Sequence, residues 1–586
     1  MKALQSLNKY LYKYRGRLFL GLIITIGARV FAVFTPQLIR KSTNAIEDYV
    51  NGDIARVDIV KDKLLMNIGL IVGAALASAI FTFLMRQTFI VVSRYIEYDL
   101  KNEVYTQYQN LSLDFYKRNR TGDLMNRISE DVSKVRMYVG PALMYGVQTL
   151  TLFVVVIYFM VKAAPTLTLY TLIPFPILSF AIYKLSVAIN KRSAEIQRFL
   201  SHLNTYTQES FSGIAVIKSY GILNRFNTNF EQLSNESKEK NVNLAKVEAI
   251  FFPLMVLLIG FSNLFVIYFG GMQYIEGKIE NVGLIVEFLL YVNMLTWPVA
   301  SVGWITSMIQ RAEASQERIN EFLSEEPRIK NHAPDTSESI LGEIEFKNVS
   351  FTYEDTNIVA LKDVSFKVNK GETLAIMGKT GSGKSTILEL IGRLYDVNQG
   401  EILIDGKPIE NLNLNALREQ LGYVPQDAFL FSSSIRDNIK FGKADATEED
   451  IINAAKNAAV HDNIIEFNKG YDTVLGERGI TLSGGQKQRV SIARAIIKDP
   501  QIVLFDDCLS AVDTETEEEI FNKLNKISSN KTSVVVSHRA SSAKNANHII
   551  ILEEGRILEE GTHSELLEKG GYYKDLYNKQ LSEKES

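Results

Sequence analysis

Six long apolar runs occupy the first half of the chain, whereas the second half alternates between short apolar and polar stretches. Each run supplies the roughly 20 residues that a helix needs to cross the hydrocarbon core of a bilayer. This pattern predicts an α-helical transmembrane domain of six helices over residues 18–327. The runs lie at residues 18–39, 64–92, 141–161, 167–189, 250–271 and 282–308.

Residues 1–17 place apolar side chains at helical spacing among Lys9, Lys13, Arg15 and Arg17. The pattern suits an elbow helix on the membrane surface, with an ordinary surface helix as the alternative. Basic residues before the first span favour a cytoplasmic N-terminus, and six spans return the chain to that side. No cleavage site follows the first apolar run, so we expect a multi-pass protein of the cytoplasmic membrane. The acidic stretch 46–63 then becomes an outside loop.

Two polar connections, residues 95–137 and 191–248, are too long for turns and keep a helical period. We expect them to extend the membrane helices into the cytoplasm and to reverse near residues 113–124 and 212–221. A short helix at each reversal could contact the nucleotide-binding domain that the second half of the chain is expected to form. The alternative, a solvated hairpin, leaves the aromatic side chains at these reversals unexplained.

Arg29, Arg86, Gln87 and Glu287 lie in or near the apolar runs. Ionisable groups at membrane depth are costly and usually face a cavity or a partner. They are candidates for a transport pathway, or else they pair structurally or reach the interface. Pro298 lies inside the sixth run and is expected to kink that helix.

The second half reads as a soluble α/β domain. Residues 328–342 form a polar linker, residues 343–578 interchange strand and helix patterns, and residues 579–586 form a polar tail. The net charge of −3 argues against a nucleic-acid partner. A single cysteine, Cys508, excludes an internal disulfide.

A phosphate-binding loop lies between a predicted strand and a predicted helix of this domain. Its glycines let backbone N–H groups surround phosphates, Lys384 brings a positive charge to the β- and γ-phosphates, and the Ser385 hydroxyl is a ligand for Mg²⁺. The helix N-terminus also faces the anion. The loop consists of Gly378, Lys379, Thr380, Gly381, Ser382, Gly383, Lys384, Ser385 and Thr386.

Two further motifs follow. The apolar strand 502–505 ends in Asp506, which after a phosphate loop predicts a carboxylate that helps to hold Mg²⁺. The segment 482–486 has two glycines before a predicted helix, which is a second phosphate-binding end. One nucleotide cannot easily use both ends within one subunit. Two facing domains, each lending this segment to the nucleotide of the other, would use both.

The order of these motifs resembles the ATP-binding cassette family. With six membrane segments before the cassette, the chain resembles a half-transporter of the type IV exporter fold, and it looks closest to bacterial multidrug-resistance-like proteins of the Mdl type. The segments 121–125 and 476–479 contribute to that likeness. The resemblance implies ATP hydrolysis coupled to transport, the cofactors ATP and Mg²⁺, and coupling helices at the two reversals. The implied partners are a second half-transporter chain, the bilayer and a small hydrophobic substrate.

The resemblance also assigns residues. Tyr353 stacks on adenine, Gln426 senses Mg²⁺ and the γ-phosphate, His538 contacts the γ-phosphate, and Glu477 lies where coupling helices meet the cassette. Ser483 and Gly485 contact the γ-phosphate held by the partner chain, and Gly484 and Gln486 belong to the same nucleotide-binding segment. Asp513 belongs to the segment that crosses the dimer interface.

One position departs from the family pattern. The residue after the metal-binding Asp506 is usually Glu, the base that polarises the attacking water, and here it is Asp507. Aspartate is one methylene shorter, and a misplacement of roughly 1 Å can cost about 10²-fold in rate. The resemblance therefore favours a heterodimer in which this chain holds the slow ATP site. Because the other motifs are intact, a homodimer with Asp507 as a weak base stays open.

The expected function is ATP-driven export of a drug-like molecule or lipid by alternating access. Aromatic residues such as Phe288, Tyr291 and Trp297 suit hydrophobic cargo, although they are also ordinary in membrane helices. The alternatives are an ATP-gated channel, a homodimeric lipid flippase and a peptide exporter. A soluble ATPase of DNA repair or translation disagrees with six membrane segments.

Overall fold

The computed structural model describes the chain except residues 1, 53, 55, 334–338, 477–478, 480–481, 509–530 and 586. It divides into two compact units. The first comprises Met1–Gln109 and Gly122–Glu325, and the second comprises Asn110–Thr121 and Glu326–Ser586. The second unit thus includes residues 113–121 of the first predicted reversal.

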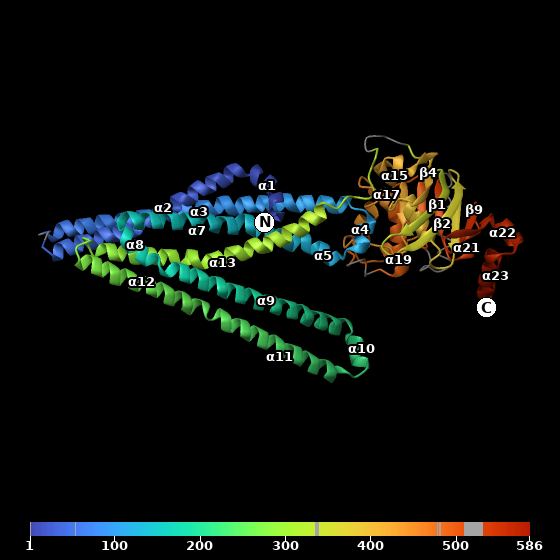
Figure 1. The fold of residues 1–586 in the computed structure, drawn as a ribbon. Coiled ribbons are helices and arrows are strands. Elements are labelled where there is room, and N and C mark those ends of the chain that lie inside the picture. Colours follow the sequence, from blue (N-terminus) through green and yellow to red (C-terminus); the bar gives the residue numbers. More distant parts are fainter. Residues whose placement is uncertain are drawn as a thin grey trace. The chain divides into compact units, whose positions relative to one another are not determined.

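The described residues of the first unit form helices joined by short turns, and six helical stretches are long and apolar enough to cross a membrane (Figure 1). Two short segments within the third stretch are π-helical. The elements are η1 (Ala3–Leu7), α1 (Asn8–Lys13), α2 (Arg15–Val50), α3 (Val57–Asn110), α5 (Thr121–Asn126), η2 (Arg127–Asp131), α6 (Val132–Met137), η3 (Tyr138–Ala142), α7 (Leu143–Ala163), α8 (Pro165–Leu172), α9 (Pro174–Ser212), α10 (Ile214–Ser219), α11 (Leu223–Glu248), α12 (Phe251–Ile275) and α13 (Gly283–Leu323).

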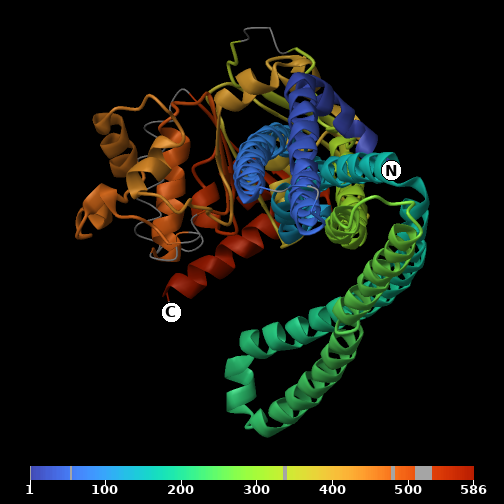
Figure 2. The same ribbon diagram turned by 90° about the vertical axis from the view of Figure 1, so that its left-hand side faces the viewer.

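Five of the six helical stretches extend beyond their apolar runs at both ends, and α13 extends beyond its run at the C-terminal end. The predicted outside loop shrinks to the few residues between α2 and α3, because helical structure continues through its polar flanks. Pro298 lies within α13. The helices α9 and α11 run side by side, with α10 at the end of the hairpin that they form (Figures 1 and 2). Helix α13 contributes most to the packed interior, since its buried face includes Phe288, Tyr291 and Leu295.

The described residues of the second unit form two sheets, of order β2-β1-β4-β5 and β10-β9-β3-β8-β7-β6. The central strand β3 pairs in parallel with β8 and β9. A parallel central strand is covered on both faces, which explains its nearly uniform apolar sequence. The strands are β1 (Ile344–Tyr353), β2 (Ile358–Val368), β3 (Thr373–Gly378), β4 (Gln399–Ile404), β5 (Lys407–Pro408), β6 (Leu421–Val424), β7 (Ile502–Asp506), β8 (Thr532–Val536), β9 (His548–Glu553) and β10 (Arg556–Gly561).

The helices of this unit surround the sheets. The last helix continues to residue 585, so the predicted polar tail is the end of a helix that begins in the cassette. The helices are α4 (Leu113–Arg118), α14 (Lys384–Ile391), η4 (Ile409–Asn411), α15 (Leu414–Glu419), α16 (Ile435–Lys440), α17 (Glu448–Asn457), α18 (His461–Ile465), η5 (Gly470–Asp472), α19 (Gly484–Ile496), α21 (Ala540–Ala543), α22 (His563–Lys569) and α23 (Tyr572–Glu585).

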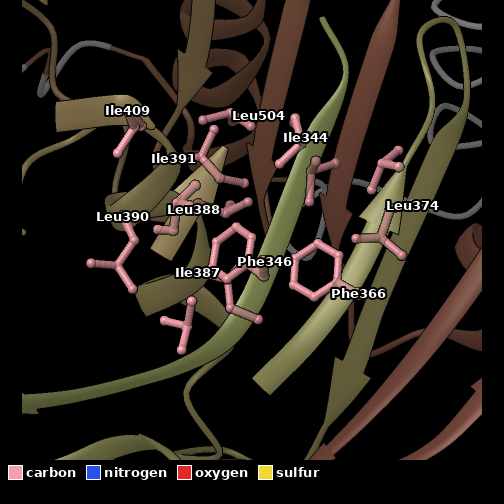
Figure 3. Close-up of a cluster of buried hydrophobic side chains, with 14 of the residues drawn as sticks. Ile344, Phe346, Phe366, Leu374, Ile387, Leu388, Leu390, Ile391, Ile409 and Leu504 are labelled. Carbon is pink, nitrogen blue, oxygen red and sulfur yellow. The ribbon is translucent and has the colours of Figure 1, made fainter. Parts of the chain in front are cut away.

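The core of the cassette fixes the helix that follows the phosphate loop. The rings of Phe346 and Phe366, on paired strands β1 and β2, stack with centroids 4.5 Å apart. They belong to the same buried cluster as Ile387 and Ile391 of α14 (Figure 3). Burying each such side chain contributes about 1.5–3 kcal/mol. The cluster therefore holds α14, and with it the end of the phosphate loop, against the sheets.

Candidate functional site

The phosphate loop connects β3 directly to α14. Gly378 and Gly383 adopt positive φ angles of 144° and 101°. A Cβ at Gly378 would lie 2.2 Å from the carbonyl oxygen of Leu552, and one at Gly383 would lie 2.3 Å from that of Ala360. Only glycine fits both the backbone conformation and the space at these two positions.

The side chain of Lys384 folds back over this loop. Its Nζ donates to the carbonyl oxygens of Gly378 at 2.9 Å and Lys379 at 2.8 Å. Burial lowers the pKa of Lys384, and the carboxylates of Asp507 and Asp506 oppose that shift. The buried hydroxyl of Ser382 has no hydrogen-bond partner in the described part of the chain. A buried donor without a partner beside a buried cation indicates a place for an anion.

A hydroxyl and a carboxylate meet at the start of α14. The Ser385 Oγ donates to Asp506 Oδ1 at 2.8 Å, and Asp506 is the last residue of β7. Burial raises the pKa of Asp506, although the hydrogen bond from Ser385 opposes the shift. Mg²⁺ typically takes one or two protein oxygens and completes its shell with phosphate and water. The two oxygens fit such an ion, whose charge would also stabilise the buried carboxylate.

The strand end beyond Asp506 gathers three more predicted residues. Asp507 has a left-handed backbone, with φ of 43°, and its N–H donates to the carbonyl oxygen of Val536 at 3.0 Å. The Gln426 Nε2 donates to Asp507 Oδ2 at 3.4 Å. Burial and the charge of Lys384 lower the pKa of His538, and Asp507 opposes them. The backbone thus presents the Asp507 carboxylate toward the imidazole of His538 and the side-chain amide of Gln426.

Tyr353 lies at the end of β1 against α14. Its hydroxyl shares a hydrogen bond with Thr386 Oγ1 at 3.0 Å and donates to Glu389 Oε2 at 2.7 Å. The Nζ of Lys117, on α4, lies 4.7 Å from the centre of the Tyr353 ring. The sequence reading missed Glu389 and Lys117. The position of Glu389, one helical turn after Thr386, is a signal that periodicity could have found.

A different link, also missed, anchors the segment of His538. The Gln580 side chain of α23 donates from Nε2 to the His538 carbonyl oxygen at 2.9 Å, and its Oε1 accepts from the Ala540 N–H at 2.7 Å. No local pattern marks Gln580, because it lies in the stretch read as a tail.

The second phosphate-binding end is formed separately. Ser483 and Gln486 make a reciprocal capping box at the start of α19, with bonds of 3.0 and 3.2 Å. Within the part of the chain that the structure describes, no hydrogen bond joins Ser483–Gln486 to the phosphate loop. Gln488 of the same helix donates to the Gln426 carbonyl oxygen at 3.4 Å. The predicted residues Glu477 and Asp513 lie outside the described residues.

Known proteins match both units. Residues 18–299 match the ABC transporter transmembrane region, and residues 361–510 match the ABC transporter family. The chain is 35% identical to the multidrug resistance-like ATP-binding protein MdlA of Escherichia coli, over 95% of this chain and 94% of MdlA. The chain belongs to the ABC transporter family. As a member, it binds ATP and couples ATP hydrolysis to transport.

Two other similarities agree with this assignment. A probable multidrug resistance ABC transporter ATP-binding/permease protein of Bacillus subtilis, YheI, is 34% identical over 99% of this chain and 97% of its own length. The structure of a bacterial Atm1-family ABC exporter with ATP bound superimposes with a TM-score of 0.78 at 26% identity, over 98% of both chains. The predicted fold, a six-helix membrane domain followed by an α/β cassette of the type IV exporter class, is confirmed.

Proposed function

We propose that this transporter exports a hydrophobic or amphipathic molecule across the cytoplasmic membrane, with its cassette and both termini in the cytoplasm. The names of its relatives MdlA and YheI, which refer to multidrug resistance, support that cargo class. The basic N-terminal helix supports the orientation. Lys9 and Lys13 of this helix pair with Glu103 and Asp99 of α3, so the helix is held against α3.

A second chain completes the transporter. Helix α11 has no buried residue, and the end of the α9–α11 hairpin exposes large apolar side chains, with Phe211 at 72% and Tyr220 at 78%. Apolar side chains gathered on a surface support an interaction site. The occupant that we propose is the cassette of the partner chain, which would make α10 the second coupling helix and α4 the first.

ATP with Mg²⁺ would bind where Lys384, Ser385 and Asp506 meet, and Ser483 would serve the nucleotide of the opposite chain. Within the described residues no hydrogen bond joins the two phosphate-binding ends, which supports this division. Closure of two cassettes around two nucleotides then drives alternating access, provided that ATP binds the closed state more tightly than the open state.

The partner is a different half-transporter with glutamate at the catalytic position. The observation that carries this proposal is the identity and setting of Asp507, whose short carboxylate is 3.4 Å from Gln426 in a left-handed backbone. A partner chain with glutamate would supply the faster site, and the segment Ser483–Gln486 of this chain would complete it.

The deciding experiment measures ATPase activity in lipid nanodiscs for the wild type, Asp507→Asn and Asp507→Glu. We expect the chain alone to be nearly inactive, and Asp507→Glu to raise its turnover. If the wild type alone hydrolyses ATP and Asp507→Asn abolishes the activity, Asp507 is a working base and the homodimer is correct.

Export itself is tested in inside-out vesicles that contain the assembled transporter. ATP-dependent accumulation of a lipophilic dye should disappear with Lys384→Ala, because the variant lacks the buried cation of the phosphate loop. Accumulation that persists in this variant contradicts ATP-driven export. Single-channel currents that require ATP would instead identify a channel.

A further inference from the structure

Helix α23 packs beside the strand that leads into the phosphate loop. Tyr573 is fully buried in the same apolar cluster as Met377 of β3 and Ala540 of α21. The carboxylate of Glu559, on β10, accepts from the backbone N–H groups of Tyr572 at 2.6 Å and Tyr573 at 3.2 Å. These N–H groups belong to the first turn of the helix, where they have no partner within the helix. The start of α23 is therefore anchored by both apolar packing and hydrogen bonds.

Gln580 lies two helical turns beyond Tyr573 and holds the segment of His538. Its Nε2 donates to the His538 carbonyl oxygen at 2.9 Å, and its Oε1 accepts from the Ala540 N–H at 2.7 Å. A side-chain amide both donates and accepts, so this one side chain satisfies a backbone acceptor and a backbone donor. Glutamate, which has the same length, would keep only the acceptor at neutral pH.

Other bonds fix the residues that precede His538. The Ser537 N–H donates to the Ile376 carbonyl oxygen of β3 at 3.1 Å, and Ser537 Oγ accepts from the Arg539 N–H at 3.0 Å. Gln580 fixes the residues that follow. The backbone is thus held on both sides of the histidine, which limits the directions that its side chain can take.

The imidazole of His538 lies on the side of the phosphate loop. Burial lowers the pKa of His538, and the charges of Lys384 and Asp507 also act on it, in opposite directions. Both charged residues belong to the candidate ATP site. A change in the backbone at His538 would therefore move the imidazole relative to the place where the phosphates bind.

We infer that Gln580 is a positioning residue for His538, and that it directs the imidazole at the γ-phosphate of ATP. The inference rests on the proposed ATP site and on the contact with the γ-phosphate that the family resemblance implies for His538. Only ATP carries a γ-phosphate, so this contact favours ATP over ADP. Gln580 then sets the preference between the two nucleotides without contacting either.

The test measures nucleotide preference in the full-length chain in nanodiscs. The Kd values for ATP and ADP are obtained by displacement of the fluorescent analogue TNP-ATP, with EDTA present to remove Mg²⁺ and prevent hydrolysis. The variants are Gln580→Met, His538→Ala and their combination. Methionine keeps the length of glutamine and the helix but lacks both hydrogen bonds. Lys574→Met, at an exposed position of the same helix, is the control.

The two single variants should act in the same direction. His538→Ala should lower the preference for ATP over ADP about tenfold, because a hydrogen bond to a charged group is lost. Gln580→Met should lower it about threefold, because the imidazole is present but less well placed. Neither should change the Kd for ADP by more than about twofold. Lys574→Met should leave both Kd values unchanged.

The combined variant separates positioning from support of the fold. If Gln580 acts through His538, adding Gln580→Met to His538→Ala should have no further effect on the preference. Additive effects, or an equal loss of affinity for ATP and ADP in Gln580→Met, would overturn the inference. An unchanged preference in His538→Ala would also overturn it, because the contact with the γ-phosphate would be absent.

A second variant covers the case in which Gln580→Met lowers the Tm. Gln580→Glu keeps the acceptor for the Ala540 N–H and loses the donor to the His538 carbonyl oxygen. Its preference for ATP should lie between those of the wild type and Gln580→Met. A preference equal to that of the wild type would show that the bond to His538 has no role.

Failure of this inference and failure of the export proposal give different results. Nucleotide binding requires neither cargo nor a partner chain, so the titration reports on the cassette alone. Dye accumulation in vesicles reports on export. Accumulation that is lost in Lys384→Ala, together with an unchanged nucleotide preference in Gln580→Met, would overturn the role of Gln580 and leave the proposed function standing.

Discussion

The Nζ of Lys117 lies 4.7 Å from the ring centre of Tyr353 and 4.9 Å from that of Tyr395. Partial desolvation would lower the pKa of Lys117, but the neighbouring Tyr395 side chain and the charge of Glu389 outweigh it and raise the pKa. Lys117 is therefore a cation at neutral pH. Helix α4, at the first predicted reversal, thus places a positive charge over the ring of Tyr353. Tyr353 is the residue that the family resemblance assigns to stacking on adenine.

Removing this charge should uncouple the two domains more than it weakens ATP binding. A cation–π contact contributes about 0.5–2 kcal/mol. We expect Lys117→Met, which keeps the apolar stem, to reduce substrate-stimulated ATPase activity severalfold while the Kd for ATP changes by less than about threefold. Nucleotide binding by fluorescence and turnover in nanodiscs check the two quantities.

The control is Lys134→Met, which removes an exposed lysine of α6 that pairs with Glu130 of η2, and it should alter neither quantity. An equal loss of ATP affinity and stimulation would show that Lys117 acts on the nucleotide itself. Unchanged stimulation would make its contact with Tyr353 only structural.

The phosphate loop should tolerate alanine at Gly381 but not at Gly383. Gly383 combines a φ of 101° with a Cβ position 2.3 Å from the Ala360 carbonyl oxygen, whereas Gly381, at φ of 82°, has nothing within 4 Å of its Cβ position. Positive φ alone costs a non-glycine residue about 1–3 kcal/mol. We expect Gly383→Ala to weaken ATP binding well beyond Gly381→Ala in an equilibrium titration. Equal losses would mean that strain, and not the clash, decides both.

Asp506→Asn should stabilise the protein and abolish hydrolysis. Burial raises the pKa of Asp506, so the folded chain holds this proton more tightly than the unfolded chain does. Above the raised pKa the ionised group destabilises the fold, and this penalty fades as the pH falls through it. Without nucleotide and Mg²⁺, the variant should have a higher Tm than the wild type at pH 7.5, with a smaller gain at pH 5.

Differential scanning fluorimetry at the two pH values checks this expectation, and Glu410→Gln, which removes an exposed carboxylate, is the control. Saturating Mg²⁺ and ATP should reverse the order by stabilising only the wild type. A Tm that falls in Asp506→Asn at pH 7.5 would show that the hydrogen bond with Ser385 outweighs the burial of charge.

The effects on thermal stability of substituting the two partners of an ion pair between α2 and α13 should be strongly non-additive. Arg40 Nη1 lies 3.1 Å from Glu287 Oε2, and Glu287 is 2% exposed and also accepts from the Tyr291 hydroxyl at 2.7 Å. Breaking a buried pair by removing one partner typically costs 3–5 kcal/mol, and less is expected here because Arg40 is a third exposed. Arg40→Met alone should therefore lower the Tm more than Arg40→Met combined with Glu287→Gln. Additive effects in this cycle would show that the pair does not stabilise the fold.

Some of the site was visible in the sequence because its chemistry is local. The spacing of Gly378, Lys384 and Ser385 follows from how a loop and a helix N-terminus surround a phosphate. The six spans follow from their length and hydropathy. Glu287 was singled out by its membrane position alone, and its structural pairing was one of two readings that the sequence left open.

Other parts depended on distant segments. Ser385 meets Asp506 across 121 residues, and Arg40 meets Glu287 across 247. Gln580 supports His538 only because α23 packs back on the cassette. Such contacts arise from the packing of elements, which periodicity does not encode.

The sequence by itself determined the membrane spans, the cassette and the order of its motifs, because these are set by neighbouring residues within single helices, strands and loops. Only the tertiary structure decided that Lys117 covers Tyr353 and that Gln580 holds the segment of His538. Both results require the side chains of elements far apart in the chain to approach within a few ångströms, and that approach depends on how whole helices and sheets pack.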